Sequence, residues 1–212
     1  MGKLLNGFNG PFSGKAGSMI GYVINGQGYI KGHYKARTKD VSEKELFNRK
    51  KFAVAQAWLK PLTPLLRGGF KNYRPTFQGF AAAKSYLMKN ALSVEGSEIK
   101  IDPSKVMVAV GSMSHPREVH FTIEEQSIRF TWDTKCINDQ DPSDQATILA
   151  YDLKAAWPYG EIYGPSRSAG QYLMKFQEDH MPESPLLLYF AFFSTDRRKW
   201  SDSLFLGTAV IQ

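Results

Sequence analysis

The stretch Leu186-Leu187-Leu188-Tyr189-Phe190-Ala191-Phe192-Phe193-Ser194 decides the fold of the second half of the chain. It carries no charged residue and consists of aliphatic and aromatic side chains up to Ser194. Such runs are typical of strands, and alternate side chains of a strand in a sandwich face the space between the sheets. We therefore predict a strand from Leu186 to Ser194 whose aromatic side chains lie mostly in the core.

Other β-rich runs surround this strand at intervals of about ten residues, a spacing typical of sandwiches with about seven strands. From Ile99 onward the sequence therefore predicts an all-β domain. The runs are 105–110, 119–124, 127–132, 147–153, 159–163, 172–176, 186–194 and 203–211.

Three of these segments resemble fibronectin type III domains. Arg129-Phe130-Thr131-Trp132 resembles the tryptophan-bearing strand, and Leu188–Ser194 followed by Ser201-Asp202-Ser203 resembles the last strand pair. Ile148-Leu149-Ala150-Tyr151 lies between them. The resemblance covers residues 100–212 and implies an immunoglobulin-like or fibronectin-like sandwich, with Tyr189 in a structural role.

The sequence of the first half of the chain predicts a hairpin followed by helices. Residues 17–39 alternate around Asn25-Gly26, a pair that favours a type I′ hairpin turn. Ser42-Glu43-Lys44-Glu45 has the pattern of a capping box and predicts a helix to about Lys60. Two prolines restrict its continuation, Arg67-Gly68-Gly69-Phe70 reads as a break, and a second helix is predicted over 76–90.

Charge divides the chain in the same place. Residues 1–90 hold 16 lysines and arginines but only Asp40, Glu43 and Glu45, while the remaining residues hold 11 basic and 17 acidic side chains. We predict an α+β protein with two regions: a basic N-terminal β-hairpin plus two helices (1–96), packed with a C-terminal β-sandwich (97–212).

The whole chain also resembles a family of bacterial proteins of unassigned function. The resemblance rests on Gly10-Pro11-Phe12-Ser13-Gly14-Lys15-Ala16-Gly17, Gly21-Tyr22, Arg49-Lys50-Lys51-Phe52, Ser85–Asn90 and the Ser201-Asp202-Ser203…Gly207 segment. It implies a shared fold and brings no functional residues with it.

A basic stripe is the most informative candidate site. Five successive alternate positions are basic, and in a strand such side chains point to one side about 6.6 Å apart. The residues are Lys31, His33, Lys35, Arg37 and Lys39, with Arg49, Lys50 and Lys51 on the following helix. This row fits a polyanion with Tyr22, Tyr29 and Tyr34 as stacking faces, but a charged, protected sheet edge is the simpler explanation.

The remaining candidate sites have simpler explanations. Gly10–Ala16 departs from the phosphate-loop spacing, and the acidic loop 133–144 lacks the glycine and glutamate of a calcium loop. The four histidines are scattered, and the carboxylates around Cys136 disfavour its thiolate. We predict no catalytic residue, metal site or cofactor. Trp157 and Tyr159 are the aromatic residues expected to be exposed if the sandwich binds carbohydrate.

These observations favour a non-catalytic interaction or structural protein that docks an acidic partner or another copy of itself. Nucleic-acid binding through the basic stripe is the alternative, and a carbohydrate-binding module is a second one. No apolar run has membrane-spanning length and no signal sequence is visible, so we expect a cytoplasmic protein without a membrane partner.

Overall fold

The computed structural model describes residues 3–4, 10–24, 26–36, 38, 40–73, 79–177 and 181–211. The chain divides into two compact units, residues 1–43 and residues 44–212. We call the first the N-terminal sheet and the second the body. The N-terminal sheet contains β1 (Lys3–Leu4), β2 (Phe12–Ala16), β3 (Met19–Ile24) and β4 (Gln27–Gly32).

The N-terminal sheet is antiparallel in the order β1-β2-β3-β4. The predicted hairpin is present as β3 and β4, with Ile24 opposite Gln27 and Gly26 at a φ of 81°. Asn25 of the predicted turn lies outside the described residues. The prediction of a strand as far as Lys39 is wrong, because β4 ends at Gly32. Its partner β3 begins only at Met19, so the chain beyond Gly32 has little strand left to pair with.

Three α-helices and a 3₁₀ turn form one side of the body. The two predicted helices are present, although residues 74–78 at the predicted start of the second lie outside the described residues. A further helix between them was not predicted: it carries Pro64 in its first turn, where proline is tolerated, and it continues through Gly68. The predicted break at residues 67–70 therefore comes only at its end, where the helix stops at Gly69. The elements are α1 (Glu43–Leu59), η1 (Lys60–Leu62), α2 (Thr63–Gly69) and α3 (Gly79–Asn90).

Three antiparallel sheets form the rest of the body. A hairpin that the sequence analysis did not predict, β5 (Leu92–Glu95) and β6 (Glu98–Ile101), follows α3. The larger sheets have the orders β10-β9-β12-β13 and β11-β8-β7. Their strands are β7 (His120–Glu124), β8 (Ser127–Thr131), β9 (Gln145–Asp152), β10 (Trp157–Glu161), β11 (Gln171–Lys175), β12 (Leu186–Phe193) and β13 (Leu204–Ala209).

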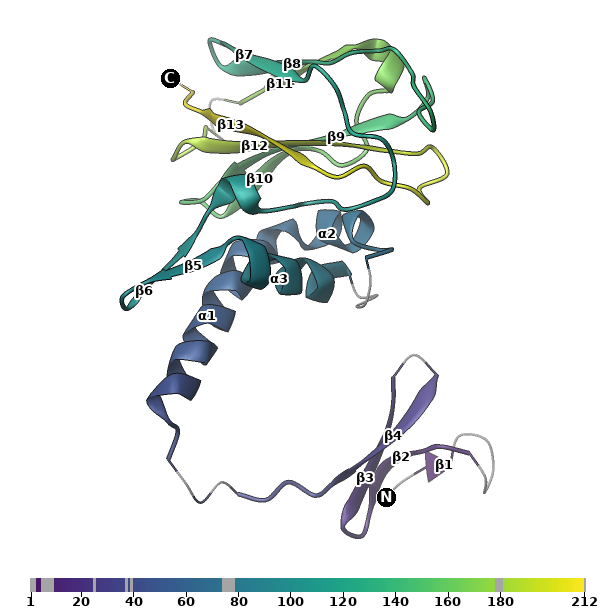
Figure 1. Cartoon of the computed structure of the whole chain (residues 1–212), viewed down its shortest axis with the longest axis vertical. Coiled ribbons are helices and arrows are strands. Elements are labelled where there is room, and N and C mark those ends of the chain that lie inside the picture. Colours follow the sequence, from purple (N-terminus) through teal and green to yellow (C-terminus); the bar gives the residue numbers. More distant parts are fainter. Residues whose placement is uncertain are drawn as a thin grey trace. The chain divides into compact units, whose positions relative to one another are not determined.

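The four-stranded sheet lies between two hydrophobic clusters, so the body has three layers (Figure 1). Alternate residues of β12 divide between the clusters. Tyr189 and Phe193 pack with α1, α2 and α3, whereas Phe190 and Phe192 pack with the three-stranded sheet. The proposed division at residue 96 stays a prediction about folding units, but helices from before it share one core with strands from after it.

An extended segment, residues 106–113, connects the helical layer to the sheets. A strand was predicted over 105–110, and this is wrong: η2 (Pro103–Lys105) is followed by chain that joins no sheet. Its amides are bonded individually instead. Ser203 Oγ accepts from the amide of Val108 (2.9 Å), Asp202 Oδ1 accepts from that of Gly111 (3.0 Å), and the Val110 amide donates to Gly69 O (2.9 Å).

Asp152, at the end of β9, collects hydrogen bonds from two separate segments. It accepts from the amides of Lys154 (2.8 Å), Ala155 (3.0 Å) and Glu183 (2.6 Å), and from the hydroxyl of Ser184. Burial by itself would raise the pKa of Asp152, but these hydrogen bonds together hold that pKa below its ordinary value. The carboxylate therefore joins the β9–β10 turn to the segment that leads into β12.

We predict that Asp152→Asn lowers the free energy of unfolding by about 1–3 kcal/mol at neutral pH, because an amide cannot accept all of these bonds. Since the folded-state pKa is depressed, the contribution of Asp152 is present above about pH 4 and is lost as the pH falls further. Urea unfolding of the two proteins at neutral and acidic pH measures this. The loss should shrink in acid, and a pH-independent difference would contradict the assigned role.

Asp196→Asn is the matched control. Asp196 is an exposed carboxylate whose partners, Ser194 Oγ and the Arg198 amide, lie within two residues of it. The free energy of unfolding of this variant should be close to that of the wild type, because Asp196 joins no distant segments.

Candidate interaction surfaces

One face of the N-terminal sheet combines tyrosine and lysine. Residues that pair across strands share a face, which places Lys15, Ile20 and Lys31 beside Tyr22 and Tyr29. The two tyrosine rings stack with centroids 5.5 Å apart, and Lys31 Nζ lies 5.4 Å from the centroid of the Tyr22 ring. We call these five residues the tyrosine-lysine face. Cations and aromatic surfaces are the two elements that bind single-stranded nucleic acid without sequence preference.

The opposite face is built on glycines. Gly14 pairs with Gly21, so this part of the face carries no side chains of its own. Phe12 and Pro11 fill the space: a Cβ at Gly21 would lie 2.7 Å from the Phe12 ring, and one at Gly28 would overlap Pro11 Cβ. This arrangement was not predicted from the sequence, although the glycines recur at 14, 21 and 28 after Pro11-Phe12.

The predicted basic stripe is only partly described by the structure. Lys31 lies in β4, while His33 and Lys35 follow the strand, and all three are exposed. Arg37 and Lys39 lie outside the described residues. Because β4 ends before His33, strand geometry does not align the described members of the stripe on one side.

The basic residues of α1 do not form a single patch. Arg49 is exposed and pairs with Glu45 one turn earlier, with Nη2 and Oε1 2.7 Å apart. Lys50 is exposed, whereas Lys51 is half-buried with Nζ 4.9 Å from the centroid of the Phe47 ring. An exposed ion pair of this kind contributes little to stability, about 0–1 kcal/mol.

A shallow groove lies between α1 and α3. Phe52, Ala81 and Met88 supply its apolar surface. Lys84 Nζ lies 3.8 Å from the centroid of the Phe52 ring and donates to Gln56 Oε1 at 2.8 Å. Burial lowers the pKa of Lys84 from its ordinary value. This lysine is therefore held by contacts between its own helix and α1.

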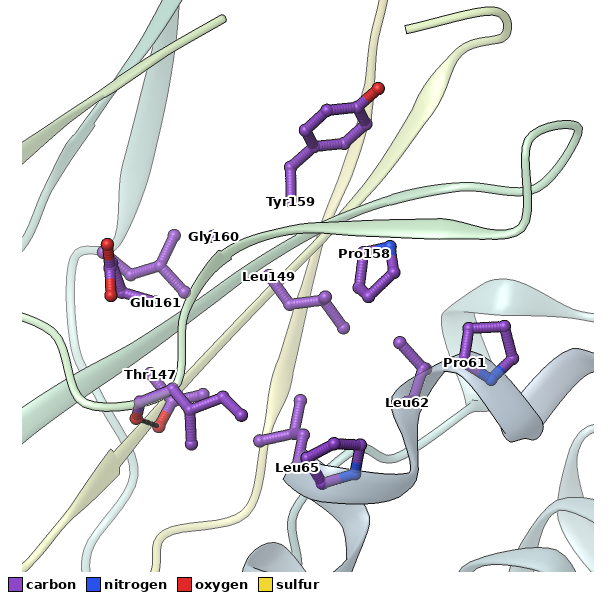
Figure 2. Close-up of a pocket in the computed structure, with 12 residues that line it drawn as sticks. Pro61, Leu62, Leu65, Thr147, Leu149, Pro158, Tyr159, Gly160 and Glu161 are labelled. Atoms are coloured by element: carbon purple, nitrogen blue, oxygen red, sulfur yellow. Dashed lines mark hydrogen bonds between the residues drawn. The ribbon is translucent and has the colours of Figure 1, made fainter. Parts of the chain in front are cut away.

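A small apolar cleft separates η1 and α2 from the strands β9 and β10 (Figure 2). It has about 110 Å³ of free volume, and Glu161 is the only carboxylate that lines it. Figure 2 shows leucine and proline side chains converging on this space, with Thr147 and Glu161 at one end. The hydroxyl of Thr147 is already engaged, donating to Ile162 O at 2.8 Å. The cleft thus offers mainly hydrophobic contact.

The two aromatic residues predicted for a carbohydrate platform differ in their surroundings. Trp157 is 55% exposed at the start of β10. Tyr159 is half-buried and packs edge-on against Phe176, and its ring points away from the cleft (Figure 2). Burial accordingly raises the pKa of Tyr159. Only Trp157 of the pair presents a largely open ring.

The acidic loop bonds to its own chain. Asp133 forms an ion pair with Arg117, with Oδ2 and Nη2 3.0 Å apart. Asp139 Oδ1 accepts a hydrogen bond from Ser114 Oγ at 2.7 Å. Cys136 is exposed within this loop. Within the described ranges, no group of three or more histidine, cysteine or acidic side chains is arranged to hold a metal ion.

The last charged residue of this loop, Asp144, belongs to a buried pair. Its carboxylate lies 3.3 Å from Arg167 Nη2, and both side chains are almost fully buried. Burial raises the pKa of Asp144 despite the neighbouring guanidinium. Arg167 also stacks on Phe192, and its carbonyl accepts from Trp132 Nε1 at 2.8 Å. These contacts fix the segment before β11 between the sheets, which is a structural role.

Comparison with known proteins places the chain in a family. A family model described as Family of unknown function (DUF6266) matches residues 11–207, so the chain belongs to this family. No curated protein matches the chain, and no solved structure matches it either. Among the helices of the described residues, none is long and apolar enough to cross a membrane.

We predict that Gly21→Ala and Gly28→Ala each destabilise the N-terminal sheet by about 1–3 kcal/mol, since the added methyl group collides with Phe12 or Pro11. Hydrogen exchange of the β2 and β3 amides measures the effect. Gly32→Ala is the control, because a Cβ at Gly32 meets open space. Equal protection in all three variants would contradict the assigned packing.

Proposed function

We propose that this member of the DUF6266 family is a non-catalytic interaction protein. In this proposal the body is a rigid scaffold, and the N-terminal sheet docks an acidic partner or a second copy of the chain. The observation that carries the proposal is the exposure of large apolar side chains on and beside the N-terminal sheet. Each is at least 40% exposed: Met19 (48%), Ile24 (45%), Tyr29 (40%), Ile30 (63%) and Tyr34 (79%).

Small sheets become stable by burying one face. The described part of the N-terminal sheet buries few side chains of either face. Gly21 is its only fully buried residue there, and it has no side chain to contribute. Met19 and Ile30 lie on one face of this sheet and Ile24 and Tyr29 on the other, so both faces expose apolar side chains. Exposed apolar surface is a common mark of binding sites. Docking would cover the surface that this unit leaves open.

The architecture of the body supports the scaffold role. The strand orders β11-β8-β7 and β10-β9-β12-β13 are compatible with an immunoglobulin-like or fibronectin-like sandwich, a framework on which many binding proteins are built. Here the outer face of the four-stranded sheet is covered by α1, α2 and α3. Partner binding in this protein is therefore better served by surfaces outside that face.

Charge supports an acidic partner. The first 43 residues contain six lysines and arginines against Asp40 and Glu43, and residues 44–90 contain ten basic residues against Glu45. Several carboxylates of the body are already paired internally, among them Asp133 with Arg117, Glu124 with Arg129 and Asp144 with Arg167. Complementary charge accelerates encounter more than it adds affinity, so the apolar surface must supply most of the binding energy.

We predict that p-benzoylphenylalanine at position 34 yields discrete protein adducts after irradiation of cells that produce the chain, because Tyr34 is the most exposed of these side chains. Denaturing gels with mass spectrometry identify what is attached. The same photoreactive residue at Leu153, 43% exposed on the body, is the control and should give few adducts. Equal labelling from both positions, or none from position 34, would reject docking through the N-terminal sheet.

Binding of single-stranded nucleic acid is the second candidate, and the tyrosine-lysine face is the observation that favours it. We predict that Lys15→Glu with Lys31→Glu weakens a low-salt mobility shift of a single-stranded oligonucleotide by about tenfold or more. The control reverses two exposed lysines of the body, Lys135 and Lys175, and should bind as the wild type does. An unshifted oligonucleotide in the wild-type lane would remove this candidate.

A further inference from the structure

The strand β4 is an edge of the N-terminal sheet: within the described ranges, no strand pairs with its outer side. It is the terminal strand in the order β1-β2-β3-β4, and all six of its residues are exposed. Its pairing with β3 is regular from Met19↔Gly32 to Ile24↔Gln27. Edges are usually protected by charge, proline or a bulge, but β4 has one charged residue, Lys31, and no proline.

The hydrogen-bond pattern shows which backbone groups of β4 point outward. The amide of His33, just after the strand, donates to Ser18 O at 2.9 Å. In an antiparallel pair, alternate residues direct their amide and carbonyl groups toward the same neighbour. The odd-numbered residues of β4 therefore bond to β3. The outward set consists of Gly28, Ile30 and Gly32.

We infer that β4 pairs antiparallel with β4 of a second copy, with Ile30 on the two-fold axis. The outward set is symmetric about Ile30, so Gly28 lies opposite Gly32 of the second copy and Ile30 lies opposite its counterpart. This register forms about six hydrogen bonds between the chains, two for each hydrogen-bonded pair. The inference rests on the proposed interaction function and names the partner as the chain itself.

The side chains are compatible with this register. The sequence Gly28-Tyr29-Ile30-Lys31-Gly32 places Tyr29 opposite Lys31 of the second copy, so no lysine faces another directly. A cation over a tyrosine ring is a favourable contact. The glycines on both sides of Ile30 leave room for the two isoleucines, each 63% exposed before pairing. If the two-fold axis passed through Lys31 instead, Lys31 of each copy would lie directly opposite the other. Like charges directly opposite each other destabilise a sheet.

A two-fold pairing of this kind is closed. The same surface is used by both copies, so assembly stops at a dimer. Attraction between a basic and an acidic half would instead be head-to-tail and give rings or filaments. Particle mass distinguishes the two arrangements.

Sedimentation velocity of the full chain across a wide concentration series tests the inference. We expect a reversible dimer, and Ile30→Lys should raise its dissociation constant by about tenfold or more by placing a charge on the axis. Ile137→Lys is the control, since this isoleucine is 44% exposed in a loop of the body and lies outside the N-terminal sheet. A monomer at every concentration, assembly beyond the dimer, or a dimer that survives Ile30→Lys would overturn the inference.

Cysteine pairing tests the register itself. In a Cys136→Ser background, Tyr29→Cys and Lys31→Cys are prepared as separate full-length proteins and then mixed under mild oxidation. Opposed positions without hydrogen bonds have Cα atoms about 4.5 Å apart, within disulfide range. Identical positions are diagonal neighbours about 7–8 Å apart, too far for a disulfide. We expect a covalent dimer from the mixture and little from either protein alone, and equal yields in all three would overturn the register.

The two proposals fail separately. A monomeric chain that still gives adducts with another protein from position 34 would overturn pairing through β4 and leave the docking function standing. A dimer that loses its association in Ile30→Lys, without adducts to any other protein, would support self-association as the interaction. A monomer without adducts would overturn both.

Discussion

The strand β12 has no side that faces solvent, and the rest of the body depends on this constraint. All eight of its residues are buried, with Tyr189 on the helical side and Phe190 on the sheet side. Complete burial of such a side chain stabilises the fold by about 1.5–3 kcal/mol. The side chains of β12 provide this full stabilisation only when the helical layer and the three-stranded sheet are both present. The helices are thus part of the same core as the sheets.

Much of the secondary structure could be predicted because its signals are local. The uncharged run at β12, the hairpin around Gly26 and the capping pattern before α1 each act within a few residues. The failures have distant causes. Residues 106–110 have the composition of a strand, but their amides bond to partners such as Ser203, far along the sequence. Gly69 continues α2 because the helix must approach the carbonyl of Val108 closely, and no local pattern shows this.

The candidate site was less predictable than the fold. The alternating basic residues predicted a strand as far as Lys39, with these side chains on one side of it. Instead β4 ends at Gly32, which pairs with the first residue of β3. The cleft beside Pro158 depends on how η1 packs on β9 and β10, which composition cannot specify. What the sequence did contain was the recurrence of glycines at 14, 21 and 28, which thins one face of the sheet and leaves β4 with few side chains. Only the strand register shows that these glycines lie on the same face of the sheet.

The double burial of β12 also bears on how the chain is made. Leu186–Phe193 has no charge, proline or glycine over eight residues, a composition typical of segments that aggregate when exposed. In the order of synthesis, α1 to α3 and β9 precede it, so the surfaces that will cover it are translated first. The interval in which a nascent chain displays this segment uncovered therefore depends on how soon those layers fold. A delay in the folding of the helices would lengthen that interval, which makes the helical layer a safeguard against misassembly as well as a structural layer.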